Sequence, residues 1–289
     1  KERQLDSSKS RGCGRKELAA DGRGRHAVTS PGRHEPTPRS RLQPTSQRFL
    51  SPANSMLRQL AWRGAARLRA PFPCQPLPAA ALDSLERLGY AVVPGWLRAA
   101  DTAALLADAL ALEAAGVPRA AGVGGVAESE SSDWAVELKT EQRRAASVWI
   151  HESSLHGAPA ARLALLSTAE ALRAELLDAG CTERPLDTEA TSLAYLYYPA
   201  GGFYRRHRDT PPAPSPTGEH REVSLLLYLD PVWRPDWGGA LRIFAEPAPV
   251  DVQPEAGTLV LMHSPLLEHE VLETSRPRHC VVGWLCSVT

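Results

Sequence analysis

The chain has 289 residues, of which 43% are hydrophobic and 23% are charged, a composition typical of a folded globular protein and not of a disordered one. No apolar run approaches the roughly 20 residues that a membrane-spanning helix needs. The formal net charge is zero, but the charges are unevenly distributed along the chain. Residues 1–82 carry 16 Lys and Arg and 5 Asp and Glu, whereas residues 83–289 carry 17 Lys and Arg and 28 Asp and Glu. The acidic second segment disfavours a nucleic-acid partner.

Residues 1–82 are expected to form a disordered basic leader ahead of the folded domain 83–289. Residues 1–55 are rich in Arg, Ser, Gly and Pro and show no hydrophobic period. From Met56 onward the leader is Arg-rich and free of acidic residues, and a helix here would place four apolar residues on one face: Leu57, Leu60, Ala61 and Leu68. This composition is typical of an organelle transit peptide, and a simple basic tail is the alternative.

The cysteines indicate a reducing compartment. Their number is odd and none are spaced as CxxC, which argues against a disulfide framework and a cysteine zinc site. The five positions are Cys13, Cys74, Cys181, Cys280 and Cys286. We therefore expect an intracellular protein, either cytoplasmic or, if residues 56–82 direct import, located in a mitochondrion or plastid.

Beyond residue 82 the patterns predict helices first and strands afterwards. A short helix precedes a strand at 88–94, Asp101 is expected to cap a helix that ends near Gly116, and a second helix covers 158–179. From residue 188 the pattern becomes that of β-structure, with runs at 191–198, 223–229, 240–244, 257–262, 268–272 and 280–285. This order predicts an α+β fold with a mainly β core arranged as a sandwich or barrel.

The most informative polar residues form the tripeptide His207-Arg208-Asp209. Alternate residues of an extended chain share a face, so His207 and Asp209 could bind one metal ion together. A second histidine would complete the two-His, one-carboxylate set of non-haem Fe(II) oxygenases. The downstream candidates are His220, His263, His269 and His279.

An arginine near the last strand is a candidate anion site. Arg278 lies nine residues after His269 and could hold a carboxylate with two parallel hydrogen bonds. Arg276 is the competing choice, since it could share a face with Arg278 on an extended segment. Each of these features is common when it occurs alone, and the combined pattern carries the prediction.

A protein kinase is an alternative suggested by the literal His-Arg-Asp and by Asp236-Trp237-Gly238. The kinase catalytic loop requires Asn five residues after its Asp, and here Pro214 occupies that position. The kinase interpretation is therefore disfavoured.

Over 85–285 the sequence resembles the prolyl-4-hydroxylase type of 2-oxoglutarate/Fe(II) dioxygenase, including the hypoxia-inducible-factor prolyl hydroxylases and their microbial relatives. The matching residues are Tyr198-Pro199, Tyr204, His207, Asp209, Leu227-Tyr228-Leu229-Asp230, Trp233, Gly238 to Phe244, His269-Glu270-Val271, Arg278 and Trp284. The resemblance implies a double-stranded β-helix, or jelly roll, braced by N-terminal helices. Its catalytic core would span 188–286.

The resemblance also implies roles for individual residues. His207, Asp209 and His269 would hold Fe(II), while Arg278 and Tyr228 would bind the distal carboxylate of 2-oxoglutarate. Tyr198 would line the co-substrate or substrate pocket. O2 would be the second co-substrate and ascorbate a further cofactor.

The reaction implied is hydroxylation of a C–H bond, most commonly of a prolyl residue in a protein, with release of succinate and CO2. A protein or peptide substrate is thus expected in preference to a small molecule. The alternative is an iron-free β-sandwich that binds a partner without catalysis.

Overall fold

The structure is a computed structural model that describes residues 70–124, 136–137, 140–150, 156–182, 184–187, 191–210 and 219–288. The chain divides into two units, Lys1–Arg48 and Phe49–Thr289, and all described residues belong to the second. The expected leader lies outside the described residues as far as residue 69, so the transit peptide stays a prediction. Within the described ranges no helix has both the length and the apolar character needed to cross a membrane.

The folded region begins earlier than the expected boundary at residue 83. Helix α2 (Ala79–Leu88) starts before it, and Leu77 is already buried in the core. The backbone N–H of Phe72 donates to Thr168 Oγ1 at 2.8 Å, and that of Leu77 donates to Glu175 Oε1 at 2.6 Å. The predicted domain boundary between residues 82 and 83 is therefore wrong for residues 70–82. The prediction placed the boundary where the charge changes, but residues 70–82 pack on the domain through apolar side chains and backbone hydrogen bonds, although they contain no acidic residue.

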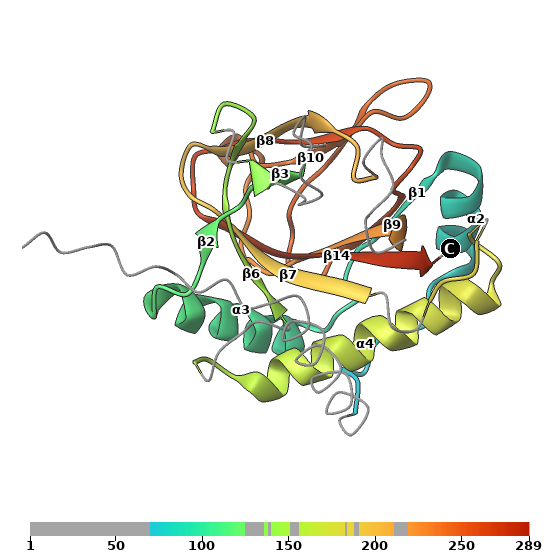
Figure 1. Ribbon diagram of the computed structural model, residues 1–289, viewed down its shortest axis with the longest axis horizontal. Helices are drawn as coiled ribbons and strands as arrows, with labels where there is room; N and C mark the ends of the chain where they lie inside the picture. The colour runs from blue at the N-terminus through green and yellow to red at the C-terminus, as the bar shows by residue number, and fades with distance from the viewer. Residues whose placement is uncertain are drawn as a thin grey trace, which may run out of the picture. The chain divides into compact units, whose positions relative to one another are not determined.

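Two antiparallel sheets make up most of the described fold (Figure 1). The larger sheet has the order β1-β12-β9-β14-β7-β6-β2 and the smaller one β11-β10-β13-β8-β5. The larger sheet comprises β1 (Tyr90–Val93), β2 (Arg119–Ala120), β6 (Ala146–Trp149), β7 (Thr191–Tyr198), β9 (Glu219–Tyr228), β12 (Leu259–His263) and β14 (Arg278–Val288). The smaller sheet comprises β5 (Arg143–Arg144), β8 (Gly202–His207), β10 (Leu241–Ile243), β11 (Val250–Val252) and β13 (His269–Thr274).

Helices α3 (Ala99–Ala114) and α4 (Pro159–Asp178) run along one side of the larger sheet, and β8 and β10 lie on its other side (Figure 1). A separate pair, β3 (Val123–Gly124) and β4 (Val136–Glu137), and a 3-10 turn, η2 (Pro235–Trp237), complete the described elements. Two packed antiparallel sheets braced by helices confirm the expected α+β, jelly-roll-like fold.

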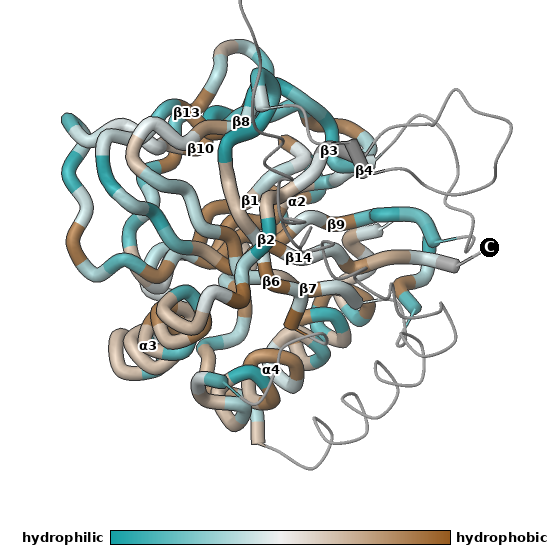
Figure 2. The backbone as a smooth tube through the Cα atoms, turned by 60° about the vertical axis from the view of Figure 1, so that its left-hand side comes forward, coloured by the Kyte–Doolittle hydropathy of each residue, from teal (hydrophilic) through white to brown (hydrophobic). Residues whose placement is uncertain are grey.

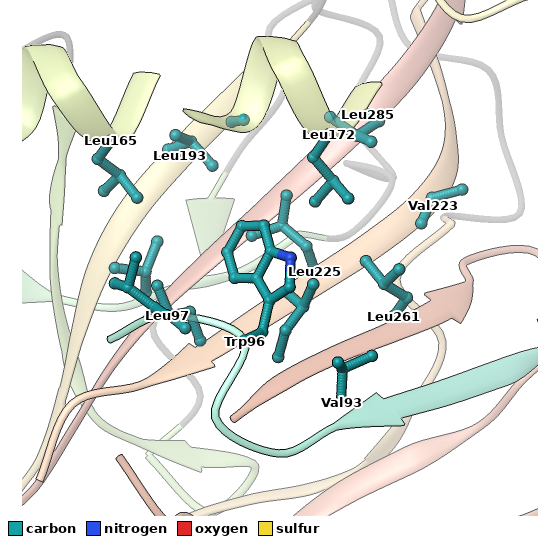
Figure 3. Packing of buried hydrophobic residues seen from close by; sticks show 14 of the residues in the cluster. Val93, Trp96, Leu97, Leu165, Leu172, Leu193, Val223, Leu225, Leu261 and Leu285 are labelled. Atoms are coloured by element: carbon teal, nitrogen blue, oxygen red, sulfur yellow. The ribbon is translucent and has the colours of Figure 1, made fainter. Parts of the chain in front are cut away.

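The alternation of side chains along the strands explains why the larger sheet has two buried faces. Leu193, Tyr195 and Tyr197 of β7 join the core under the helices, whereas their neighbours Ala194, Leu196 and Tyr198 join the core between the sheets. Figure 3 shows the first of these cores, with Leu165 and Leu172 of α4 above strand residues and Trp96 among them. In Figure 2 the hydrophobic colour is concentrated in the middle of the molecule, around the labels β6 and β14, whereas the labelled end of β9 is hydrophilic.

The predicted elements agree with the structure where the apolar pattern is strong. The strand at 191–198 is reproduced and the helix at 158–179 is matched to within one residue at each end. Strands β8 and β11 were not predicted, because β8 is partly exposed and polar and β11 has three residues. Asp101 does not cap α3: it lies in the first turn, where its carboxylate accepts from Arg98 Nε at 2.8 Å.

A buried ion pair joins the two long helices to the larger sheet. Asp108 of α3 and Arg162 of α4 have fully buried side chains, with Nη1 3.2 Å from Oδ1. The Tyr195 hydroxyl donates to the other carboxylate oxygen at 2.9 Å, and the backbone N–H of Ala158 also donates to Asp108. These contacts hold α3 and the start of α4 on β7. They lie on the helix side of the larger sheet, opposite the core between the two sheets.

Candidate metal centre and anion site

His207 and His269 meet across the smaller sheet. Strand β8 ends at His207 and β13 begins at His269, and the two residues are direct partners in the antiparallel register. Asp209 follows β8 by two residues, and its carboxylate reaches both rings: Oδ1 is 3.4 Å from His207 Nε2, and Oδ2 is 3.7 Å from His269 Nε2. The three candidate ligand atoms thus lie within 4.8 Å of one another.

The structure shows which of the four candidate histidines lies close enough to His207 and Asp209 to be a third metal ligand. Among the described residues, His207, Asp209 and His269 form the one group of three or more His, Cys, Asp or Glu side chains that could hold a metal ion. His220 lies beside Glu222, and His279 contacts Asp230 and Glu113 on the helix side of the larger sheet. The spacing that singled out His269 therefore agrees with the geometry.

The protonation states of this cluster suit a divalent cation. Burial opposes ionisation of Asp209, but His269, His207 and Arg221 nevertheless hold the pKa of its carboxyl well below the usual range. Burial lowers the pKa of His269 to about 4, so its ring is neutral at pH 7. An anionic carboxylate and a neutral imidazole are the forms in which these side chains bind metals.

A backbone contact orients His207 toward the cluster. His207 Nδ1 lies 2.8 Å from the carbonyl oxygen of Arg205, which can only accept, so Nδ1 carries the proton. The lone pair of a neutral ring then lies on Nε2, which faces Asp209. The Tyr204 ring stacks on the imidazole with centroids 3.5 Å apart, which restricts its rotation.

Two serines orient Asp209, and the sequence analysis missed both of them. Ser224 Oγ donates to Asp209 Oδ2 at 2.6 Å, so Ser264, 2.7 Å away, donates to Ser224 in turn. The signal for Ser224 was available, since it is a polar residue between Val223 and Leu225 in the apolar second half of β9. Arg221 adds a bond from Nη1 to the backbone oxygen of Asp209 at 2.8 Å. Such outer contacts fix how a ligand points toward a metal.

The cluster passes a simple test of fit to a metal ion. Nitrogen and oxygen ligands lie about 2.0–2.2 Å from a metal such as zinc, which separates neighbouring ligands of a right-angled site by about 3 Å. The observed separations of 3.4 and 3.7 Å are near that value. Two imidazoles and one carboxylate with further positions open are the donor set of non-haem Fe(II) oxygenases.

Arg278 is a completely buried cation with unused hydrogen-bond donors. Its Cζ atom lies 5.0 Å from the ring centroids of both Tyr198 and Tyr228, and Nη1 donates to Cys280 Sγ at 3.4 Å. Within the described residues, Nε and Nη2 of Arg278 and the hydroxyl of Tyr228 form no hydrogen bond. Because buried donors and charges without partners are costly, this arrangement fits a carboxylate that supplies the missing acceptors.

Arg276, the competing candidate, does not lie in the core between the sheets where Arg278 is buried. Arg276 is exposed and lies over the Trp237 ring, 5.5 Å from its centroid. Tyr198, whose role was uncertain from the sequence, pairs in register with Arg278 and packs in the core between the sheets. The kinase interpretation is wrong, because β8 of the smaller sheet ends at His207, and Asp236-Trp237-Gly238 forms the end of the 3-10 turn η2.

Comparison with known proteins agrees with this geometry. Residues 193–286 match the family model described as the 2OG-Fe(II) oxygenase superfamily. A crystal structure of a Pseudomonas putida prolyl-4-hydroxylase is 28% identical, with 72% of this chain and 97% of that chain covered and a TM-score of 0.56.

Two more distant structures share the fold. A Trichoplax adhaerens prolyl hydroxylase, solved with a hypoxia-inducible-factor peptide fragment, is 21% identical, with coverage of 78% and 92% and a TM-score of 0.58. The non-haem α-ketoglutarate-dependent carbocyclase SnoK, from nogalamycin biosynthesis, is 15% identical, with coverage of 75% and 87% and a TM-score of 0.50. Residues 193–286, which contain the His-Asp-His cluster and the buried arginine, therefore resemble the 2OG-Fe(II) oxygenase superfamily in sequence and in fold.

Proposed function

We propose that this chain hydroxylates a C–H bond of a prolyl residue in a protein or peptide, using Fe(II), O2 and 2-oxoglutarate. The observation that carries the proposal is the pairing of a His-Asp-His cluster with an uncompensated buried arginine. Tyr204 links the two, because it stacks on His207 and packs against the same interior cluster as Tyr198 and Tyr228.

Each side chain has a task that its chemistry allows. Nε2 of His207, Nε2 of His269 and the Asp209 carboxylate would hold Fe(II). Arg278 and the Tyr228 hydroxyl would hold the distal carboxylate of 2-oxoglutarate, and the keto acid end would bind the metal. Tyr198 covers one face of the Arg278 guanidinium and shields it from water.

The bound iron would supply the activation of O2 that decarboxylates 2-oxoglutarate and oxidises the substrate. One oxygen atom enters succinate and the other enters the substrate, so that R–H, O2 and 2-oxoglutarate yield R–OH, succinate and CO2. We expect ascorbate to sustain turnover by keeping the iron in its Fe(II) state.

The prolyl substrate rests on similarity. The Pseudomonas putida relative, at 28% identity, is a prolyl-4-hydroxylase, and the Trichoplax adhaerens structure contains a peptide. The jelly-roll fold alone does not select this substrate, since a carbocyclase shares it. The reaction class and the substrate are therefore tested separately.

The test uses the full chain with Fe(II), ascorbate and 2-oxoglutarate, together with a peptide library in which a central residue is Pro or Ala. We expect succinate in amounts matched by a mass increase of about 16 Da, one oxygen atom, on prolyl peptides only. Oxygen incorporated into another residue would contradict the prolyl assignment and leave the reaction class intact. Absence of iron-dependent succinate under all conditions would favour the iron-free binding module instead.

A further inference from the structure

Cys280 lies beside the buried cation that the proposed function assigns to the co-substrate. It follows Arg278 by two residues on β14, so both side chains point into the interior between the sheets. Cys280 is completely buried, and its register partners are Tyr228 and Leu196. The thiol is thus part of the wall against which the Arg278 guanidinium rests.

Most contacts of the Arg278 guanidinium fix its position but do not determine which of its nitrogen atoms faces which neighbour. The rings of Tyr198 and Tyr228 attract the cation through their faces, an interaction that does not distinguish one nitrogen from another. Gly239 has φ +71°, and a Cβ at that position would lie 3.2 Å from Arg278 Cδ, so the stem passes close to the backbone there. The contact from Nη1 to Cys280 Sγ, 3.4 Å long, is directional and therefore can select the rotation.

The nitrogens that this contact leaves free form one edge of the guanidinium. Nη1 lies on the same side as Cδ, so Nε and Nη2 present their N–H bonds side by side on the opposite edge. These are the two nitrogens without partners among the described residues, as is the hydroxyl of Tyr228. Two parallel N–H bonds match the two oxygens of a carboxylate.

We propose that Cys280 is a positioning residue: its sulfur holds Nη1 of Arg278 and thereby presents the Nε/Nη2 edge to the distal carboxylate of 2-oxoglutarate. This inference rests on the proposed function and adds a determinant of co-substrate affinity that neither touches the reacting atoms nor binds the metal.

The thiol suits this task because it accepts a hydrogen bond without adding charge. Burial raises the pKa of Cys280, so the group is a neutral thiol at pH 7. Arg278 keeps its full positive charge for the incoming carboxylate. An acidic side chain at the same position would instead occupy the guanidinium and compete with the ligand.

The experiment compares Cys280→Ala, Cys280→Val and Cys280→Ser in the full chain. Cys280→Val keeps the volume and removes the acceptor, whereas Cys280→Ser keeps an acceptor. The matched control is Cys286→Ala, since Cys286 is a buried residue of the same strand and the same interior cluster.

Binding is measured calorimetrically for 2-oxoglutarate and for 2-oxopentanoate, which has the same chain length but lacks the distal carboxylate. Loss of one weak hydrogen bond should reduce 2-oxoglutarate affinity roughly fivefold in the Ala and Val variants. The affinity for 2-oxopentanoate should stay unchanged. In turnover, KM for 2-oxoglutarate should rise by a similar factor with kcat preserved, and Cys280→Ser should stay close to the unaltered chain.

Three results would overturn the role of Cys280. They are wild-type affinity in both the Ala and Val variants, equal losses for the two keto acids, and an equal loss in Cys286→Ala. The second and third results would indicate a merely structural contribution. If the unaltered chain does not bind 2-oxoglutarate at all, the proposed function itself fails, which is a different outcome from a silent Cys280 variant.

Discussion

His207 and His269 are direct cross-strand partners, with ring centroids 4.3 Å apart, although 62 residues separate them in the chain. Pairing of β8 with β13 therefore builds two thirds of the candidate metal site through backbone register alone. Asp209 joins them from the turn after β8, where its carboxylate accepts a hydrogen bond from Ser224 of the larger sheet. A change in the register of this strand pair would separate the histidines.

Changing His207 or His269 to Ala should abolish specific Fe(II) binding and iron-dependent succinate production. Each change removes one of three ligands, and the remaining pair offers too few donors for a stable site. His220→Ala is the matched control and should retain both properties, because His220 lies outside the cluster. Metal content after dialysis and succinate yield are the measurements. Near-full activity in either ligand variant at saturating iron would refute the assignment.

Arg278→Ala should weaken the use of 2-oxoglutarate on the order of 100-fold or more, since losing one partner of a buried ion pair costs about 3–5 kcal/mol. Tyr228→Phe removes a single donor to a charged group, worth about 1.5–3 kcal/mol, and should have a smaller effect. Iron binding should survive in both. Arg276→Ala is the control, and a loss confined to that variant would mean that the wrong arginine was chosen.

Asp108→Ala should reduce the free energy of unfolding by about 3–5 kcal/mol, because it leaves the Arg162 guanidinium buried without its carboxylate. Tyr195→Phe removes one hydrogen bond to the same carboxylate and should cost less, about 1.5–3 kcal/mol. Chemical denaturation followed by tryptophan fluorescence measures both. Equal stabilities of the two variants would argue against the ion pair as the dominant contact.

Leu77→Ala should destabilise the domain by about 2 kcal/mol or more, because Leu77 is buried in the core beside α4. Leu88→Ala, at an exposed position of α2, is the matched control and should change stability by no more than about 0.5 kcal/mol. Thermal unfolding of the full chain measures the difference. Similar melting temperatures for the two variants would place residues 70–82 outside the cooperative unit after all.

Stability should decrease as pH rises above about 6.5, the ordinary pKa of histidine. Burial opposes the charge on His279, but hydrogen bonds and attraction from Asp230 and Glu113 raise its folded-state pKa above that value. The stabilisation is complete below the unfolded-state pKa and is lost as pH rises through the folded one. His279→Gln should flatten this part of the profile.

His269 acts in a different window, so the two histidines can be distinguished. Its folded-state pKa of about 4 means that the unfolded chain binds an extra proton between about 4 and 6.5, which lowers stability in acid. Denaturation curves collected from pH 4 to 9 cover both windows. A pH slope above 6.5 that persists in His279→Gln would assign it to another group.

The sequence by itself determined the strongly patterned elements and the chemistry of the site. The unbroken apolar and aromatic run within 191–198 specifies a strand, and the residue types His207, Asp209, His269 and Arg278 restrict the ligands they can take. These inferences depend on local periodicity and on functional groups, which are both properties of the linear chain.

Only the tertiary structure decided which residues meet. Strand pairing brought His269 to His207 and left His220, His263 and His279 elsewhere. The register of β14 placed Arg278 inside, whereas Arg276 lies in the exposed bend before that strand. Ser224 and Cys280 acquired their contacts in the same way, and the segment 70–82 was revealed as part of the domain by its packing on α4. The physical reason is that long-range register and burial arise from the simultaneous packing of many segments, and no local pattern encodes the partner that a side chain will find.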